Sequence, residues 1–359
     1  MGIKLIAAAG VLLVSPFYAA FAGSVDQLVV FGDSLSDNGN AAAALASQGK
    51  SLGNYALNAL TDGPATNPPT TGPFGLWVDQ FAAKTGLPDP QPFVLNTPGG
   101  LALNPTGTNF AVASAQTGHN PNFSLSTVLT SQQVPWTTDQ LGIYNFVNGS
   151  TASPSSLYTF WAGSDDIAHS LTTNPLNFVD AAKDAANSIE ANIKMLAGEG
   201  GRYFMWFNLP PLGETPAARA FGPLGTLLAN QAASAFNGQM TDDIASLQQT
   251  LSGVTIIGVD IHAAFERITD NPKAYGFTNV TDPAQGNSGV NPNTYLFWDD
   301  LHPTTAADAL IADAAAAAAG RLISPVPEPA SLLLALLGIA VLIAPLLVSR
   351  TRRIPAALE

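Results

Sequence analysis

Short apolar segments alternate with amphipathic helical stretches along most of the chain. The apolar segments are unbroken rather than alternating, which is typical of strands buried on both faces of a parallel sheet. They predict five strands, at residues 28–31, 107–115, 157–163, 202–209 and 253–260, of which the second range includes the turn that follows the strand. Strands that alternate with helices indicate an α/β protein whose sheet is covered on both sides.

Between the strands, apolar residues recur at spacings of three and four, as on one face of an amphipathic helix. The predicted helices are residues 76–85, 179–196, 228–251, 263–268 and 304–322. The long stretch from residue 38 to residue 105 is rich in Gly, Pro, Asn and Thr and holds only the first of these helices. A loop of this length is usually functional or disordered, and we expect it to form the rim of a substrate cleft.

The first residues are typical of a secretory signal peptide. Lys4 precedes a short apolar run, residues 5–14, and Ala20-Phe21-Ala22 has the A-x-A form of a cleavage site. The run is short for a membrane anchor that stays on the protein. We therefore assign residues 1–22 to a signal peptide and expect the mature chain to begin at Gly23.

The other end of the chain holds a candidate membrane span. Residues 330–348 are uncharged and just long enough to cross a bilayer. Pro327-Glu328-Pro329 precede them, and three arginines follow, which would keep the end of the tail cytoplasmic: Arg350, Arg352 and Arg353. These features predict a C-terminal anchor or a stop-transfer sorting tail.

The tail also resembles the PEP-CTERM sorting signal of Gram-negative bacteria, in which Pro-Glu-Pro, an apolar helix and an arginine cluster follow one another. We assign residues 324–359 to such a tail. The resemblance implies that an exosortase-type machinery recognises the protein during export, often beside exopolysaccharide production. It also implies at least a transient contact with the membrane and a final location in the cell envelope, at the cell surface or outside the cell.

Composition narrows the kinds of chemistry that the chain can perform. The net charge is −13 and only 11% of residues are charged, which argues against a nucleic-acid partner. The absence of cysteine excludes disulfides, thiol catalysis and cysteine zinc sites. The four histidines show no metal-ligand spacing, so we expect neither a metal nor another cofactor: His119, His169, His262 and His302.

A serine follows the first predicted strand, and a histidine with a nearby carboxylate lies more than 260 residues later. Ser34 belongs to Gly32-Asp33-Ser34-Leu35, where the apolar run ends in turn residues. A serine hydroxyl needs a base within hydrogen-bond reach, and the base needs a third group that fixes its tautomer. Asp299 and His302 are three residues apart, so one turn of backbone can hold the carboxylate against the imidazole.

These two blocks resemble those of the GDSL, or SGNH, family of serine esterases and lipases. That family has Gly-Asp-Ser-Leu near its N-terminus and Asp-x-x-His near its C-terminus. The resemblance covers roughly residues 26–320, and we expect residues 23–323 to be the hydrolase domain. It implies the SGNH hydrolase fold, a three-layer α/β/α sandwich of the flavodoxin type with a five-stranded parallel sheet. It also implies Ser34 as nucleophile, His302 as base and Asp299 as the acid.

In that family three donors form the oxyanion hole, and this chain departs from two of them. The first donor is the backbone N–H of the nucleophile, Ser34. The second comes from a Gly-Gly pair, here replaced by Ala113 and Ser114, so Ser114 is the candidate. The third is an asparagine in Gly-x-Asn-Asp, where this chain has Asp165.

Asp165 leaves three outcomes open. An ionised carboxylate cannot donate and would repel an oxyanion, whereas a protonated one can donate if burial raises its pKa. The enzyme could then have an acidic optimum, be a slower enzyme that relies on Ser34 and Ser114, or have lost activity and act as a binding protein. We favour a functional but slowed esterase, in which Asp165→Asn raises turnover at neutral pH.

The favoured function is therefore an exported serine hydrolase that cleaves carboxylic esters through an acyl-enzyme. Acyl esters and lipids are the default substrates. Within enzymes the alternatives are O-deacetylation of an extracellular polysaccharide and acyl transfer to an acceptor other than water. From another class, the alternative is a catalytically weak or silent surface-binding protein.

Overall fold

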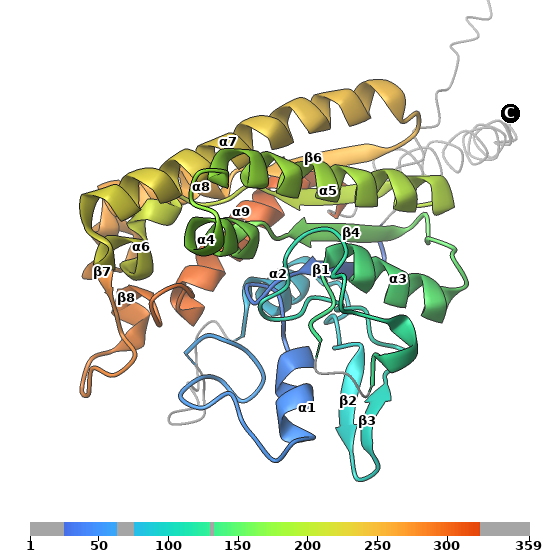
Figure 1. Ribbon diagram of the computed structural model, residues 1–359, viewed down its shortest axis with the longest axis horizontal. Coiled ribbons are helices and arrows are strands. Elements are labelled where there is room, and N and C mark those ends of the chain that lie inside the picture. Colours follow the sequence, from blue (N-terminus) through green and yellow to red (C-terminus); the bar gives the residue numbers. More distant parts are fainter. Residues whose placement is uncertain (1–24, 63–74, 130–132, 324–359) are drawn as a thin grey trace, which may run out of the picture. The chain divides into compact units, whose positions relative to one another are not determined.

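Four parallel strands form the central sheet of the protein, in the order β1–β4–β5–β6 (Figure 1). The computed structural model describes residues 25–62, 75–129 and 133–323. The strands are β1 (Gln27–Gly32), β4 (Ser156–Trp161), β5 (Tyr203–Phe207) and β6 (Thr255–Val259). In their register Phe31 lies opposite Phe160, and Phe160 lies opposite Trp206. The predicted strands at residues 28–31, 157–163, 202–209 and 253–260 are thus confirmed to within a few residues.

The strand predicted at the start of residues 107–115 does not form, so the described sheet has four strands instead of five, whereas the turn predicted to follow it is found at Ser114. The segment runs parallel to β1 but forms only an isolated bridge between Asn109 and Val30. Phe110 N donates to Val30 O at 2.7 Å, and the Asn109 side-chain amide is turned inward, where it donates to the carbonyl of Ser36 at 2.7 Å. The chain then bends at Ser114, whose φ of 66° is left-handed and incompatible with a strand.

Helices cover both sides of the sheet (Figure 1). On one side α5 (Phe178–Glu199) packs against α3 (Thr137–Asn148), α4 (Ser164–Thr173) and α7 (Gly222–Thr250). On the other side α9 (Thr305–Ala319) packs against α2 (Trp77–Thr85) and α8 (Ile261–Asp270). The predicted helices near α2, α5, α7, α8 and α9 are confirmed. The expected three-layer α/β/α arrangement is what the structure has.

Several short elements carried no periodic signal that could predict them. They are α1 (Asn40–Ala46), the antiparallel hairpin of β2 (Val94–Thr97) and β3 (Gly100–Leu103), α6 (Pro216–Ala220), and the parallel pair β7 (Asn279–Pro283) and β8 (Tyr295–Phe297). Short 3₁₀ turns lie at η1 (Leu125–Thr127), η2 (Leu212–Glu214), η3 (Pro272–Tyr275), η4 (Pro292–Thr294) and η5 (Gly320–Leu322). These elements are too short for a helical or strand period to repeat.

Stacked aromatic rings support the carboxyl end of β1. The ring of Phe31 stacks on Phe160 with a centroid distance of 5.0 Å and on Phe110 at 5.6 Å. On the next strand end, Trp161 stacks on Phe207 at 5.2 Å. All of these rings are buried. Large interlocked rings resist displacement. The ends of β1 and β4, from which the site residues continue, are therefore held rigidly.

The predicted signal peptide, residues 1–22, and the predicted PEP-CTERM tail with its span at residues 330–348 lie outside the described residues. Within residues 25–62, 75–129 and 133–323, no helix combines the length and the apolar character that a membrane span requires.

Candidate active site

Ser34 lies just past the end of β1, at the edge of the sheet where open α/β folds bind their ligands. The end of the strand is fixed by the buried amide of Gln140 on α3. This amide accepts from Gly32 N at 2.9 Å and donates to Gly32 O at 2.7 Å. A Cβ at Gly32 would lie 2.3 Å from the carbonyl oxygen of Trp161. Glycine is therefore required for β1 to lie this close to the end of β4.

The structure brings Ser34, His302 and Asp299 into one hydrogen-bonded line. His302 Nε2 lies 2.9 Å from Ser34 Oγ, and His302 Nδ1 lies 2.7 Å from Asp299 Oδ2. Both the histidine and the aspartate side chains are largely buried. A base in contact with the hydroxyl, itself held by a carboxylate, is the geometry that can activate a serine.

Asp299 is held as a carboxylate. Its Oδ1 accepts backbone N–H bonds from Leu301 at 2.7 Å and His302 at 2.6 Å. Burial alone would raise the pKa of Asp299, but the hydrogen bonds and charge of His302, with these two N–H groups, lower it to about 2. The carboxylate therefore stays charged wherever the protein is folded under ordinary conditions. Asp300, the other acid beside it, forms no hydrogen bond with His302 in the structure.

Asp37 fastens the loop of Ser34 to the turn at Ser114, a role that its position in the sequence did not reveal. The buried carboxylate accepts from Gly39 N and Asn40 N at the start of α1. It also accepts from Ala113 N, at 2.9 Å. Asp37 thus fixes the backbone on which two of the predicted oxyanion donors, Ser34 and Ser114, are carried.

Asp165 lines the same cavity as Ser34 and His302, in the first turn of α4. Burial raises the pKa of Asp165 to about 6, against the opposing attraction of His302. Gly163 precedes the helix with a φ of 120°, and a Cβ there would lie 2.6 Å from the ring of Phe236. Glycine is therefore needed at this strand-to-helix turn for α4 to begin where it does.

Two further carboxyl groups lie around Asp165. Burial raises the pKa of Asp166 to about 7, although its carboxylate accepts from the backbone and hydroxyl of Thr117. Burial, and then the charge of Asp165, raise the pKa of Asp33 well above its usual range. Asp33 Oδ2 has no hydrogen-bond partner among the described residues. This side of Ser34 therefore holds carboxyl groups that are neutral below about pH 6.

Ser114, the candidate for the second oxyanion donor, does not line that cavity. Its left-handed φ of 66° is the conformation that a glycine would take at this turn without strain. The structure thus keeps the backbone shape that the Gly-Gly pair implies, with a serine in it. Ser114 directly follows Ala113, whose backbone N–H is held by the Asp37 carboxylate.

The cavity beside Ser34 has a volume of about 430 Å³ and is lined mainly by apolar side chains. They come from α4, from the turn after β5, and from α6 and the start of α7. They include Ala168, Leu171, Leu212, Phe221, Leu224 and Leu228. Ser34, Asp165 and His302 form its polar end. A cavity with one reactive end and apolar walls suits an apolar group attached to a polar reacting centre.

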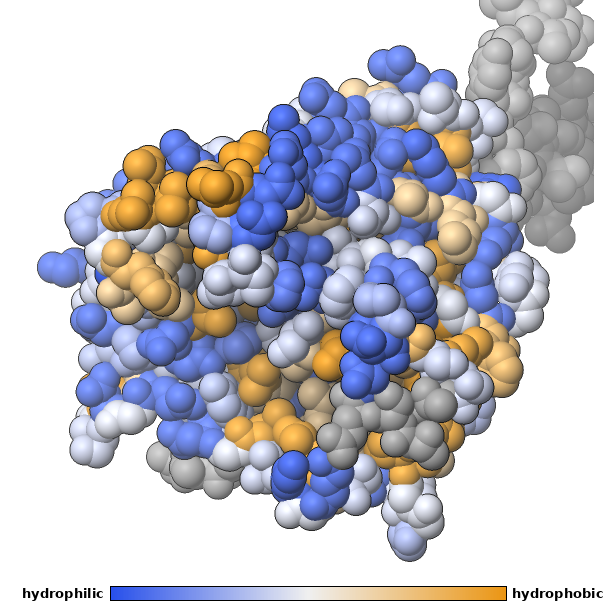
Figure 2. Space-filling model, viewed as in Figure 1, coloured by the Kyte–Doolittle hydropathy of each residue, from blue (hydrophilic) through white to orange (hydrophobic). Residues whose placement is uncertain are grey.

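The apolar lining continues onto the surface at the start of α7. Phe221 is 79% exposed and Leu224 is 64% exposed, although both also line the cavity. Figure 2 shows apolar side chains gathered over the end of the molecule where α6 and the start of α7 lie in Figure 1. Part of the cavity rim is therefore formed by the start of α7. No described residue of the 38–105 stretch lines the cavity, so the expectation that this stretch forms the rim is wrong for its described part.

The fold and the site agree with the comparisons to known proteins. A profile described as GDSL-like Lipase/Acylhydrolase matches residues 28–315, so the chain belongs to this family. It is accordingly a hydrolase that acts on ester bonds. One relative, a GDSL esterase/lipase of Arabidopsis thaliana, is 29% identical over 301 residues, which cover 78% of this chain and 85% of the relative.

Other relatives and solved structures vary in what they are described to do. An inactive GDSL esterase/lipase-like protein of Arabidopsis thaliana is 28% identical over 301 residues, covering 78% of this chain and 68% of that protein. An acetylxylan esterase from Geobacillus stearothermophilus has a TM-score of 0.40 and 13% identity, covering 85% of this chain and 96% of that one. An α/β hydrolase from a Lake Arreo metagenome has a TM-score of 0.43 and 15% identity, covering 84% and 98%. Likeness at this level does not indicate the substrate of this chain.

Proposed function

We propose that this protein is a serine esterase that cleaves carboxylic esters with an apolar acyl group, through a Ser34–His302–Asp299 triad. One observation carries the proposal: the apolar cavity ends at a serine hydroxyl that lies 2.9 Å from a histidine, and that histidine lies 2.7 Å from a buried carboxylate. No other residue type is needed to activate the hydroxyl.

In the proposed reaction, Ser34 Oγ attacks the ester carbonyl while His302 Nε2 takes its proton. The tetrahedral intermediate collapses as His302 returns that proton to the leaving alcohol, which leaves an acyl-serine. Water then attacks the acyl group by the same route and releases the acid. Asp299 keeps the Nδ1 proton of His302 in place and stabilises the imidazolium.

The proposed oxyanion site consists of the backbone N–H groups of Ser34 and Ser114 with the carboxyl group of Asp165. Asp165 can donate only while it is protonated, and burial raises its pKa to about 6. Below that pH it contributes a third donor. Above that pH its charge opposes the oxyanion, so we expect an enzyme that is slowed at neutral and alkaline pH rather than a silent binding protein.

An acyl chain is the favoured occupant of the cavity. Leu171, Leu212 and Leu228 line the space beyond Ser34, and burying a chain against them is favourable by roughly 0.8 kcal/mol per CH₂. An acetyl group would leave most of the roughly 430 Å³ unfilled. This argues for longer acyl esters over deacetylation of a polysaccharide.

The proposal includes export. The charged start, apolar run and A-x-A site support removal of residues 1–22, and the Pro-Glu-Pro, apolar run and arginine cluster support sorting through residues 324–359 by an exosortase-type machinery. The enzyme would then act in the cell envelope, at the cell surface or outside the cell. Mass spectrometry of the protein from an exporting Gram-negative host tests both ends. A chain that retains residue 1 and residue 359 would contradict the export proposal.

The activity is tested by hydrolysis of p-nitrophenyl acetate and p-nitrophenyl octanoate by the full-length protein and by Ser34→Ala. We expect octanoate to have the higher kcat/KM and Ser34→Ala to abolish both reactions. Hydrolysis that persists in Ser34→Ala would remove Ser34 as the nucleophile. A preference for acetate would not change the assignment of Ser34 as the nucleophile. It would contradict the proposal that the cavity holds the acyl chain.

A further inference from the structure

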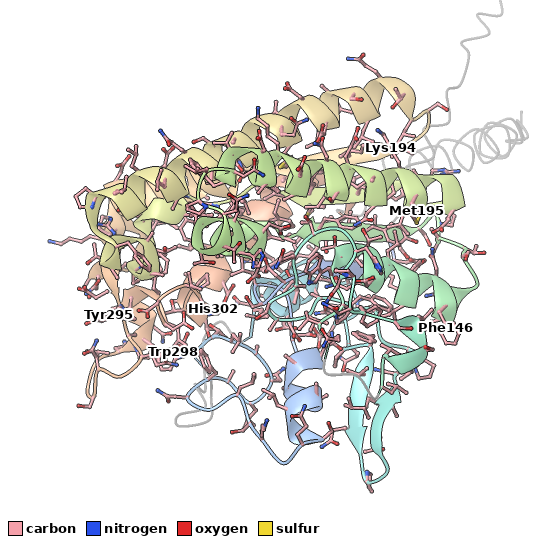
Figure 3. All side chains as sticks on the ribbon, in the orientation of Figure 1. Phe146, Lys194, Met195, Tyr295, Trp298 and His302 are labelled. Carbon is pink, nitrogen blue, oxygen red and sulfur yellow. The ribbon has the colours of Figure 1, made fainter. Side chains whose placement is uncertain are left out.

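The loop at residues 54–62 holds both ends of the segment that carries Asp299 and His302. At one end, the carbonyl of Asn54 accepts from Trp298 Nε1 at 3.0 Å and from Gln285 Nε2 at 2.7 Å. Figure 3 shows Trp298 and His302 on the same side of the molecule, beside the blue loop that contains residue 54.

The other end of the loop is fixed on the far side of His302. Thr61 Oγ1 donates to the carbonyl of Pro303 at 3.0 Å. Asp62 accepts from Thr305 N, and its backbone carbonyl accepts from Thr305 Oγ1 at 2.7 Å. Residues on both sides of His302 are thus tied to one loop from a distant part of the chain.

Tyr55 reaches from this loop to the triad itself. Its hydroxyl donates to Asp299 Oδ2 at 2.8 Å, the same oxygen that contacts His302 Nδ1. Its ring meets the His302 ring edge-on, with centroids 6.4 Å apart. Burial, then the hydrogen bond to Asp299, raises the pKa of Tyr55 to about 12, so the hydroxyl keeps its proton and remains a donor.

We propose that Tyr55 is a positioning residue for the reaction, because its hydroxyl fixes the carboxylate oxygen that orients His302. The inference rests on the proposed function of the Ser34–His302–Asp299 set. Backbone N–H groups hold Asp299 Oδ1, but among the described residues Oδ2 has only Tyr55 and His302 as hydrogen-bond partners. Without the hydroxyl, Oδ2 and the imidazole that it holds gain freedom to leave the line toward Ser34.

The hydroxyl can be removed without removing the loop's attachments. Asn54, Thr61 and Asp62 hold the loop through contacts that do not involve the Tyr55 hydroxyl. Tyr55→Phe also keeps the ring against His302. The variant therefore separates positioning of the carboxylate from stability of the loop.

The test is the kinetics of full-length Tyr55→Phe with p-nitrophenyl octanoate. A hydrogen bond to a charged group in a protected site contributes enough for a loss of about tenfold in kcat. KM and the melting temperature stay at their wild-type values because the cavity and the loop contacts remain. Tyr275→Phe, which changes a tyrosine on η3 that is 38% exposed, is the matched control and keeps wild-type kcat.

A double-mutant cycle with Asp299→Asn distinguishes positioning from a structural effect. If Tyr55 acts through Asp299, Tyr55→Phe has much less effect in the Asp299→Asn background than in the wild type. A wild-type kcat for Tyr55→Phe, or the same fold-loss in both backgrounds, would overturn the inference. Ser34→Ala tests the proposed function separately. If that variant loses activity, the proposed function stands whichever result Tyr55→Phe gives.

Discussion

The two sides of Ser34 differ in how their carboxyl groups are held. On the side of His302, Asp299 accepts two backbone N–H bonds, the Tyr55 hydroxyl and the His302 ring, and its pKa is lowered to about 2. On the side of α4, burial raises the pKa of Asp165 to about 6. Buried charge is stable only where donors surround it.

Asp299 and Asp165 therefore differ in whether the carboxyl group keeps its charge across the working pH range. The Asp299 carboxylate that orients the base stays charged over the whole working range. The group expected to face the oxyanion changes from a neutral donor to an anion within that range. We therefore expect the titration of Asp165 to change the rate with pH, and the charge of Asp299 not to change it.

The largest expected effect comes from breaking the proton-transfer side. His302→Ala removes the base that contacts Ser34, so we expect kcat for p-nitrophenyl octanoate to fall by about 10³-fold or more. His169→Ala, which changes an exposed histidine on α4, is the control and retains activity. A His302→Ala enzyme within tenfold of the wild type would mean that another group activates the serine.

The second-largest expected effect tests the role of Asp165 on the oxyanion side of the site. Asp165→Asn supplies a donor that cannot ionise, so its kcat relative to wild type should rise from about one at pH 5 to tenfold or more at pH 8. The sign follows from the pKa of Asp165, since the wild type loses its donor as the pH rises through about 6. Kinetics at pH 5, 6.5 and 8 measure it, and an unchanged or lower turnover at pH 8 would rule out this role for Asp165.

A third substitution tests the cavity that both sides share. Ala168 is exposed at its surface and lines the cavity from α4, so Ala168→Trp should fill acyl space without disturbing the core. We expect kcat/KM for octanoate to fall about tenfold while that for acetate changes little. Ala220→Trp, on α6 and outside the cavity lining, is the matched control. Equal losses for both esters would show that the acyl chain does not occupy this space.

The smallest expected effect is on stability. Burial raises the pKa values of Asp165 and Asp166, so the folded protein binds more protons than the unfolded chain between their usual value near 3.8 and about 6 to 7. Stability therefore falls as the pH rises through that window. The lowered pKa of Asp299 changes stability with pH in the opposite direction, but the stabilisation that it contributes is lost only as the pH falls toward 2.

We accordingly expect a melting temperature about 5 °C higher at pH 5 than at pH 8. Asp166→Asn should reduce this difference because it removes one of the titrating groups. Thermal denaturation followed by circular dichroism at the two pH values measures both. A protein that melts higher at pH 8 would show that these carboxyl groups do not dominate the pH dependence.

Much of the fold could be predicted from the sequence because the long elements repeat their period many times. The helices α5 and α7 and the strands β4 and β5 lie close to the predicted ranges. The segment at residues 107–115 could not be placed correctly, because its apolar run is typical of a strand. In the structure, Asn109 turns its side chain inward and Asp37 binds the backbone of Ala113, and neither of these long-range contacts can be read from the sequence.

The candidate site likewise contains residues that the sequence could predict and residues that it could not. Ser34, Asp299 and His302 were predictable because their residue types and spacing are tied to one chemistry. Tyr55 and Gln140 were not, because their roles depend on contacts across 244 and 108 residues of sequence. The pKa of Asp165 also required the structure, since it depends on the burial of the carboxyl group and on the nearby His302.

Covalent labelling is the most direct test of the central claim that Ser34 is activated by His302. The full-length protein would be treated with a fluorophosphonate, and the modified peptide would be identified by mass spectrometry beside Ser34→Ala and His302→Ala. The account predicts one phosphonylated residue, Ser34, with no labelling in Ser34→Ala and much slower labelling in His302→Ala. A wild-type protein that stays unlabelled, or one that labels at another serine, would contradict it.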